Sequence, residues 1–356
     1  MAFVIKEVGS LNYLLPLLRL FDNLSENIIL CEGECVSFVK DQKLNLKIYE
    51  INDVSSEKTE GLFLNNKIEK VVTGTSRTES IDKYAVIASR NLGIPCLSVV
   101  DHWSSFKERF SRLNECQIEE LFCYLPDKIV VIDETAKEIA LQEGIPHGKL
   151  IIGGHPGLEK IRERWTAKDI KKEVMEWRRI NALDSNRIVT FVSEPYSINF
   201  KKSSMLSRGF DEYDVISDLI NVILKLPGLN ALLLKIHPNE EKGKFSDLVV
   251  DRNIRFYEFR EEPPSFIVGL SDIIVGMGSM LLVEASLCGK KVISHQPGRG
   301  ESDTFIGNKF GLTEASYSER DLEILLRSQL AKGPELYENQ FAGSCNLLYE
   351  IILELD

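Results

Sequence analysis

Residues 273–289 read IIVGMGSMLLVEASLCG: a short β-branched run, a glycine-rich turn, and a helix-length apolar segment that ends at Gly289. The β-branched residues favour a strand, and a glycine after the last apolar residue is a common helix stop. The same order of strand, turn and helix recurs on both sides of this segment. Such alternation is typical of parallel sheets covered by helices, so the sequence predicts an α/β fold.

The alternation extends over most of the chain and is interrupted once. With 356 residues the protein is long enough for two domains. Between about residues 158 and 185 the pattern gives way to a stretch rich in lysine and arginine, which predicts an exposed helical connector. We therefore expect an N-terminal βα domain over residues 1–157, a C-terminal one over 186–335, and a last helix over 336–356 that packs back toward the N-terminal domain.

The composition argues against several classes of protein. Lys and Arg number 43 against 54 Asp and Glu, and the net charge of −11 does not suit a general nucleic-acid binder. The seven cysteines form no Cys-x-x-Cys pair, which indicates reduced thiols in the cytoplasm. The longest uncharged apolar stretches, 11–18 and 273–283, are too short for a membrane helix. We expect a cytoplasmic protein without an integral membrane segment; peripheral attachment at the inner membrane face stays open.

Several well-known catalytic motifs are absent from the sequence. The segment from Gly276 lacks the third glycine of a G-x-G-x-x-G dinucleotide turn, and no G-x-x-x-x-G-K-[ST] phosphate loop occurs. No H-E-x-x-H, G-x-S-x-G or D-x-D string is present, and the five histidines are too widely spaced to indicate a metal site. The sequence therefore predicts neither a metal nor a cofactor.

Strand ends in the second domain carry groups suited to phosphate and ribose, and ligands of open parallel sheets bind beyond such ends. His237 follows an apolar strand, and Pro238 fixes the turn that projects its imidazole toward a phosphate; the alternative is a histidine that only caps the strand. Gly278 permits close backbone approach, and Ser279 would cap a helix whose N-terminus favours an anion. Glu284 could accept hydrogen bonds from a ribose diol, or could simply be solvated.

Two weaker candidates follow other strands of the second domain. Ser193 could meet a phosphate, although a plain β-to-α turn explains it equally well. Arg299 lies in a glycine-rich strand-end loop and could pair with a phosphate through two parallel hydrogen bonds, although such loops are often surface turns. We keep both as candidate donor-binding residues.

The first domain offers a candidate base and a candidate acceptor site. Asp101 and His102 stand together at a strand end, where either could act as a general base. The competing interpretation is that Asp101 caps the next helix while His102 packs on Trp103. A second strand-end loop, whose side chains are suited to hydrogen-bonding an acceptor or to capping the next helix, contains Thr75, Ser76 and Arg77.

These strings resemble the GT-B glycosyltransferase superfamily. Lys235-Ile236-His237-Pro238 followed by Gly278-Ser279 and Glu284 is similar to the HP and Ser-x-x-x-x-Glu elements of bacterial sialyltransferase-like, Kdo-transferase-like and teichoic-acid polymerase-like enzymes. In those families the His and Ser contact donor phosphates and the Glu lies near the nucleoside. The resemblance implies two Rossmann-like domains that face each other across a cleft, with His237, Ser279 and Glu284 binding the donor.

The same resemblance implies a metal-independent, inverting glycosyltransferase of bacterial-type surface polysaccharide biosynthesis. Its donor would be a CMP-, UDP- or CDP-linked sugar, and its acceptor a glycan or a lipid-linked glycan deprotonated by Asp101 or His102. Non-hydrolysing UDP-N-acetylglucosamine 2-epimerases are the alternative, because a His-Pro-Asn string and a Gly-Ser…Glu helix recur in them. Their usual double glutamate reads Val283-Glu284 here. A non-catalytic protein that binds a nucleotide sugar is the third possibility.

Overall fold

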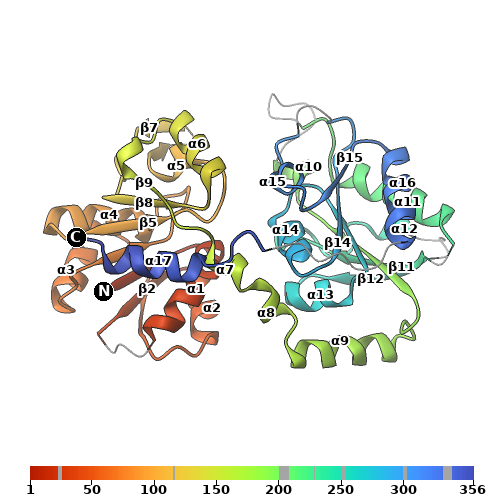
Figure 1. Cartoon of the computed structure of the whole chain (residues 1–356), viewed down its shortest axis with the longest axis horizontal. Coiled ribbons are helices and arrows are strands. Elements are labelled where there is room, and N and C mark those ends of the chain that lie inside the picture. The colour runs from red at the N-terminus through yellow and green to blue at the C-terminus, as the bar shows by residue number, and fades with distance from the viewer. Residues whose placement is uncertain are drawn as a thin grey trace. The chain divides into compact units, whose positions relative to one another are not determined.

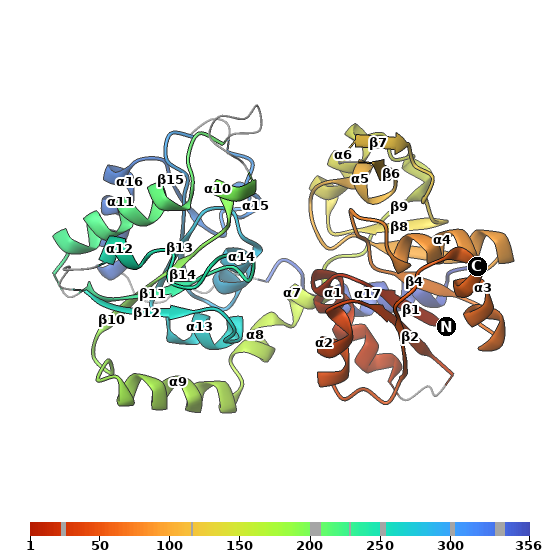
Figure 2. The ribbon, with the colours of Figure 1, turned by 180° about the vertical axis from the view of Figure 1, so that it is seen from behind.

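The computed structural model describes residues 1–22, 26–114, 117–199, 208–227, 229–249, 254–299, 303–331 and 339–356. The chain divides into two compact units (Figures 1 and 2). Unit 1 comprises Met1–Lys160 together with Gln340–Asp356, and unit 2 comprises Ile161–Asn339. The predicted boundary between residues 335 and 336 lies outside the described residues.

In the described part of unit 1, seven parallel strands form one sheet in the order β3-β2-β1-β4-β5-β8-β9. Their bounds are β1 Ala2–Ile5, β2 Ile28–Glu32, β3 Lys47–Ile51, β4 Val71–Thr73, β5 Cys96–Val99, β8 Lys128–Val131 and β9 Leu150–Ile152. The central strands are buried on both faces, which explains their almost continuous apolar sequences. A short antiparallel pair, β6 Arg112–Asn114 and β7 Gln117–Glu120, stands apart from the sheet.

Helices cover the sheet of unit 1, and local signals set several of their ends. They are α1 Val8–Phe21, α2 Cys35–Asp41, α3 Ser56–Asn65, α4 Ile81–Leu92, α5 Phe106–Arg109, α6 Glu134–Gln142 and α7 Pro156–Glu159, with a short 3-10 turn at His147–Lys149. The Asp133 carboxylate accepts the Ala136 N–H and so caps α6. Helix α4 ends where Gly93 takes the left-handed conformation, with φ of 66°.

Unit 1 is completed by α17 (Ser344–Leu353), which comes after unit 2 in the chain. The Ser344 hydroxyl accepts the His155 N–H at 2.9 Å, and the Cys345 N–H donates to Glu159 at 2.7 Å. Tyr349 stacks on Phe21 of α1, with ring centroids 5.0 Å apart. Helix α17 therefore covers part of α1 and the segment around α7.

In the described part of unit 2, six parallel strands follow the order β12-β11-β10-β13-β14-β15. They are β10 Arg187–Val192, β11 Leu229–Lys235, β12 Arg255–Phe259, β13 Ile273–Gly276, β14 Lys291–His295 and β15 Glu314–Ser316. The helices are α8 Ile161–Trp165, α9 Lys168–Ile180, α10 Tyr196–Asn199, α11 Glu212–Lys225, α12 Ser246–Val249, α13 Pro264–Leu270, α14 Met280–Leu287, α15 Ile306–Lys309 and α16 Glu319–Ala331. The expected α/β class with two parallel sheets is confirmed.

The order of strands decides which loops meet in unit 2. Strand β10 pairs with β11 on one side and with β13 on the other, all parallel. The loops after these three strands therefore emerge at one edge of the sheet, where ligands of such sheets bind. Of the helices that the structure describes, none combines the length and apolarity that a membrane crossing requires.

Candidate functional site

A pocket of about 350 Å³ lies at the carboxyl ends of β10, β11 and β13. Its lining comes from the loops after these strands and from the starts of α10 and α14: Glu194, Pro195, Tyr196, Arg208, His237, Gly278, Ser279 and Met280. Four of these residues, His237, Gly278, Ser279 and Arg208, offer hydrogen-bond donors or a helix start. The volume falls in the range of small-molecule sites.

His237 reaches this pocket from the end of β11 and is partly exposed. Its Nδ1 accepts the Asn239 N–H at 3.1 Å, so the neutral ring carries its proton on Nε2. Burial lowers the pKa of His237, so the ring is neutral at pH 7. The exposed Pro238 follows, and its carbonyl accepts a hydrogen bond from Arg260. His237 therefore presents an Nε2–H donor of fixed tautomer.

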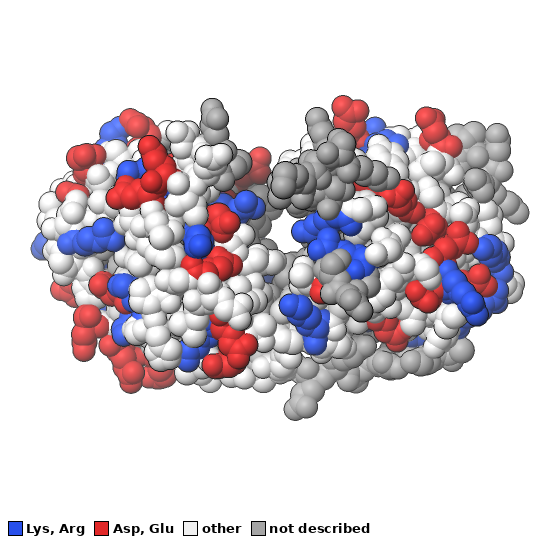
Figure 3. Space-filling model, turned by 90° about the horizontal axis from the view of Figure 1, so that it is seen from above, with Lys and Arg blue, Asp and Glu red and all other residues white. Residues whose placement is uncertain are grey.

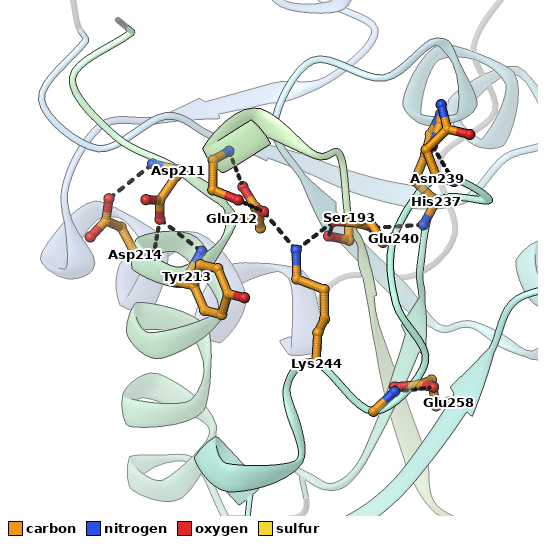
Figure 4. Close-up of polar contacts among 12 residues, drawn as sticks. Ser193, Asp211, Glu212, Tyr213, Asp214, His237, Asn239, Glu240, Lys244 and Glu258 are labelled. Carbon is orange, nitrogen blue, oxygen red and sulfur yellow. Dashed lines mark hydrogen bonds and ion pairs between the residues drawn. The ribbon is translucent and has the colours of Figure 1, made fainter. Parts of the chain in front are cut away.

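Buried charges hold the turn that carries His237 (Figure 4). The Glu240 carboxylate accepts the His237 N–H at 2.7 Å and the Ser193 hydroxyl at 2.8 Å. Lys244 lies 2.8 Å from Glu240 and 2.6 Å from Glu212, and neither glutamate side chain is exposed. Although burial alone would lower it, the hydrogen bonds to Glu212 and Glu240 raise the pKa of Lys244. The ion pairs of Lys244 with Glu212 and Glu240 form a buried frame, and Glu240 in turn fixes the His237 backbone. The Ser193 hydroxyl belongs to this frame, because it donates to Glu240.

The turn before α14 forms the opposite lip of the pocket. The Ser279 hydroxyl accepts the Leu281 N–H at 3.2 Å, which confirms that Ser279 caps the helix. A Cβ at Gly278 would lie 3.1 Å from the Tyr196 hydroxyl, so a larger residue here would require the Tyr196 side chain to shift slightly. The dipole of α14 and its first N–H groups favour an anion here.

Glu194 is a pocket residue that the sequence did not single out. One carboxylate oxygen accepts the Gly278 N–H at 2.7 Å. Burial raises the pKa of Glu194 to about 7, although the Gly278 amide and Arg208 oppose that rise. Arg208 donates to the Tyr196 hydroxyl at 2.7 Å and lies over its ring. In the sequence, Glu194 can be noticed only as an acidic residue directly after Ser193. Gly278, whose N–H donates to it, is 84 positions away.

Four predicted donor-binding residues are not part of the pocket lining that the structure describes: Ser193, Pro238, Glu284 and Arg299. Glu284 lies on α14 beyond the first turn; burial raises its pKa to about 7, and the charge of Arg164 opposes that rise. Arg299 lies in the turn after β14, where its N–H donates to the Gln296 carbonyl. The structure thus brings His237, Gly278 and Ser279 together and leaves Ser193, Pro238, Glu284 and Arg299 outside the lining.

In unit 1, Asp101 and His102 follow β5 as predicted from the sequence, but both have internal partners. Asp101 pairs with Arg109 at 3.3 Å, and each side chain is 12% exposed. Arg109 also donates to the carbonyl and hydroxyl of Thr75, at 2.9 and 3.0 Å. His102 Nδ1 lies 2.9 Å from the Ser104 hydroxyl, and burial, with the nearby Arg109 charge, lowers the pKa of the ring. Arg109 therefore ties the two strand-end loops together.

Lys83 on α4 holds the loop of residues 74–79 in place. The Lys83 ammonium donates to the carbonyls of Arg77, Glu108 and Ser111, at 3.0, 3.3 and 2.8 Å, and lies over the Tyr124 ring. Thr75 and Ser76 are buried, whereas Arg77 is exposed. The cavity beside these residues holds only about 10 Å³, room for about one water molecule.

No cluster of three or more His, Cys, Asp or Glu side chains within the described residues is arranged to hold a metal ion. Charged side chains are interspersed on the face shown in Figure 3, and no basic surface extends across the coloured part of either unit. The pocket at the ends of β10, β11 and β13 is the candidate site, because its donors suit an anionic small molecule.

The sequence matches no known family model and no curated protein. Solved structures match its fold over nearly the full length. The UDP-GlcNAc 2-epimerase from Methanocaldococcus jannaschii superposes with a TM-score of 0.70 at 13% identity, covering 99% of this chain and 98% of that chain. The Neisseria meningitidis UDP-GlcNAc 2-epimerase bound to UDP-GlcNAc gives 0.66 at 15% identity and 99% of both chains. Anabaena HepE in complex with UDP gives 0.57 at 11%, covering 99% and 95%.

These matches confirm two Rossmann-like domains of the GT-B type and correct the main functional prediction. Transfer of a sugar to an acceptor is the wrong expectation, because UDP-GlcNAc 2-epimerases, the class predicted as the alternative, are among the solved structures that match nearly the whole chain. At these identities the likeness establishes the fold alone. The narrower resemblance to sialyltransferases and Kdo transferases stays a prediction.

Proposed function

We propose that the protein is a nucleotide-sugar enzyme that binds a UDP-linked N-acetylhexosamine in unit 2 and inverts the configuration at C2 of the sugar. The observation that carries the proposal is the convergence of the His237 Nε2–H, Arg208 and the Gly278–Ser279 turn on one pocket of about 350 Å³. These groups suit a diphosphate, because they combine a fixed neutral donor, a guanidinium and a helix N-terminus. The solved structures of similar fold include epimerases bound to UDP-GlcNAc or UDP.

Each pocket group has a proposed task. His237 and Ser279 would meet the phosphates, with Arg208 as a further cationic partner. Glu284 is proposed for the nucleoside end, one turn into α14. The reaction needs no acceptor, so Asp101 and His102 are proposed instead as proton-transfer groups; burial lowers the pKa of His102, which keeps its ring neutral at pH 7 and able to accept a proton.

Incubation with UDP-GlcNAc in the absence of any acceptor tests the proposal. We expect a C2 epimer of the nucleotide sugar, detected by proton NMR, and the same final mixture when the reaction starts from that epimer. In deuterium oxide, label should enter at C2 if a C2–H bond breaks during inversion. Binding of UDP without any epimer would favour the non-catalytic nucleotide-sugar binder, and failure to bind UDP or UDP-GlcNAc would overturn the proposal.

A further inference from the structure

The amide that a phosphate would use at the turn before α14 already has an anionic partner. Strand β10 ends at Val192, and Glu194 is the second residue after it. The Glu194 carboxylate accepts the Gly278 N–H at 2.7 Å. Its position is fixed by its own backbone, because the Tyr196 N–H donates to the Glu194 carbonyl at 2.7 Å. Glu194 therefore reaches across the floor of the pocket to the opposite lip, where the helix dipole of α14 favours negative charge.

The charges around Glu194 come from every segment packed against it. Arg208 is the nearby cation and also contacts the Tyr196 hydroxyl, and Glu240 below the His237 turn is the nearby anion. His237 and Tyr196 line the same pocket as ionisable but neutral groups at pH 7. Glu240 is itself neutralised by Lys244. The charge of Glu194 is thus opposed by burial and supported by one guanidinium and the turn amides.

We propose that Glu194 is a further binding residue of the nucleotide site: its carboxylate stands in for a phosphate oxygen at the Gly278 amide, and a bound phosphate takes over that hydrogen bond from it. This inference rests on the proposed function. One N–H cannot serve two anions, and two negative charges about 4 Å apart repel by about 4 kcal/mol at the effective dielectric constant of a protein surface. Binding therefore requires Glu194 as a neutral carboxyl group, so each Glu194 that is ionised before binding takes up one proton.

The pKa of about 7 gives the expected size of the effect. A ligand that needs protonated Glu194 binds about tenfold more weakly at pH 8 than at pH 6, since about nine in ten carboxyls are ionised at pH 8. Glutamine at this position keeps an oxygen that can accept the Gly278 N–H but carries no charge. Glu194→Gln should therefore bind about tenfold more tightly than wild type at pH 8 and about equally at pH 6.

Isothermal titration calorimetry of the full chain with UDP-GlcNAc and, separately, with inorganic pyrophosphate tests this expectation. Both phosphates of UDP-GlcNAc are esterified and stay anionic between pH 6 and 8, so its pH dependence reports on the protein. Titrations at pH 7 in two buffers of different ionisation enthalpy measure the proton uptake directly. The matched control is Glu258→Gln on β12, a carboxylate that also accepts a backbone amide, that of Gly243, but does not line the pocket.

We expect the pH dependence and the proton uptake to vanish in Glu194→Gln and to persist in Glu258→Gln. Weaker binding of Glu194→Gln at both pH values, with an unchanged pH slope, would show that Glu194 only fastens the turn and would overturn the inference. If UDP-GlcNAc does not bind while pyrophosphate shows the Glu194-dependent slope, the proposed function fails and the role of Glu194 stands. If neither probe binds wild type or Glu194→Gln, both fail.

Discussion

At the carboxyl ends of the strands, the two units differ in which groups their buried cationic side chains contact. In unit 1, Arg109 and Lys83 donate to acceptors of the strand-end loops themselves, and the adjoining cavity holds about 10 Å³. In unit 2, Lys244 neutralises Glu212 and Glu240 beneath the loops, and the space above holds about 350 Å³. The loops after β4 and β5 of unit 1 are thus tied to one another, whereas the loops after β10, β11 and β13 of unit 2 leave an open pocket. A separate pocket of about 460 Å³ lies in unit 1 at the end of β3. In unit 2 the buried lysine pairs with carboxylates beneath the loops and not with backbone carbonyls of the described loops, so donors of the loops stay available to a ligand.

The strongest test of this contrast removes the buried cation of unit 2. Lys244→Met leaves two carboxylates with fully buried side chains and no counter-ion, which should cost about 3–5 kcal/mol of unfolding free energy. Urea unfolding measures the loss. Lys225→Met is the matched control, because Lys225 also lies 2.6 Å from a glutamate, Glu319, but in an exposed pair that solvent screens and that should contribute little to stability. Equal losses in the two variants would contradict the buried frame.

The corresponding change in unit 1 is Lys83→Met. It leaves three backbone carbonyls without their shared donor, and we expect a loss of about 2–4 kcal/mol, with faster amide exchange over residues 74–79 and 104–111. Lys128→Met removes a single exposed contact, to the Gly148 carbonyl, and serves as the control. An exchange pattern equal to that of the control would show that Lys83 does not hold these loops.

The pocket itself is tested by His237→Ala. Loss of one hydrogen bond from Nε2 to a charged phosphate, worth about 1.5–3 kcal/mol, should weaken UDP binding about 10- to 100-fold by calorimetry. His147→Ala, which changes an exposed histidine of unit 1, should leave the affinity unchanged. If the affinity of His237→Ala for UDP changes less than twofold, His237 is not part of the binding site. The pocket of unit 2 would then have no more claim to bind UDP than the strand ends of unit 1.

The smallest expected effect concerns pH. Burial raises the pKa of Glu284 from 4.5 to about 7, so the folded state prefers the protonated form. Its contribution to stability is therefore complete below about pH 4.5 and is lost as the pH rises through 7. Because Glu284 is partly exposed, Glu284→Gln should spare only about 1–2 kcal/mol of the wild-type loss between pH 4.5 and 7.5. Parallel pH profiles of urea unfolding for the two proteins would contradict this.

Much of the fold follows from the sequence because each unit repeats one local pattern. The strands at 71–73, 128–131 and 273–276 lie where apolar β-branched runs meet turns, and Gly93 ends its helix as expected. Strands β1 to β3 are harder to recognise, since Ala2–Ile5 directly precedes an equally apolar helix and Lys47–Ile51 alternates charged residues at an exposed edge. Their assignment depends on pairing with distant segments, which no local pattern encodes.

The residues of the candidate site also divide into those that a local pattern predicts and those whose role depends on distant partners. His237 and Ser279 could be predicted because each follows its own strand directly, and that position alone places it at the functional edge. Glu194 and Glu240 could not, because their roles depend on partners far along the chain: Gly278 for one, Ser193 for the other. Glu284 stands in a recognisable motif, yet its helical position leaves it outside the pocket lining. The long-range hydrogen bonds of buried carboxylates are the part of this site that no local sequence pattern predicts.

Helix α17 also fixes an order of events during synthesis. A ribosome delivers all of unit 2 before it delivers Ser344–Leu353, so the last helix of unit 1 is made more than 180 residues after Lys160. Until then Phe21 and His155 lack Tyr349 and Ser344, and apolar surface on α1 stays exposed to chaperones or to aggregation. Unit 2 is continuous in the chain, so all of its residues are present once Asn339 has been made.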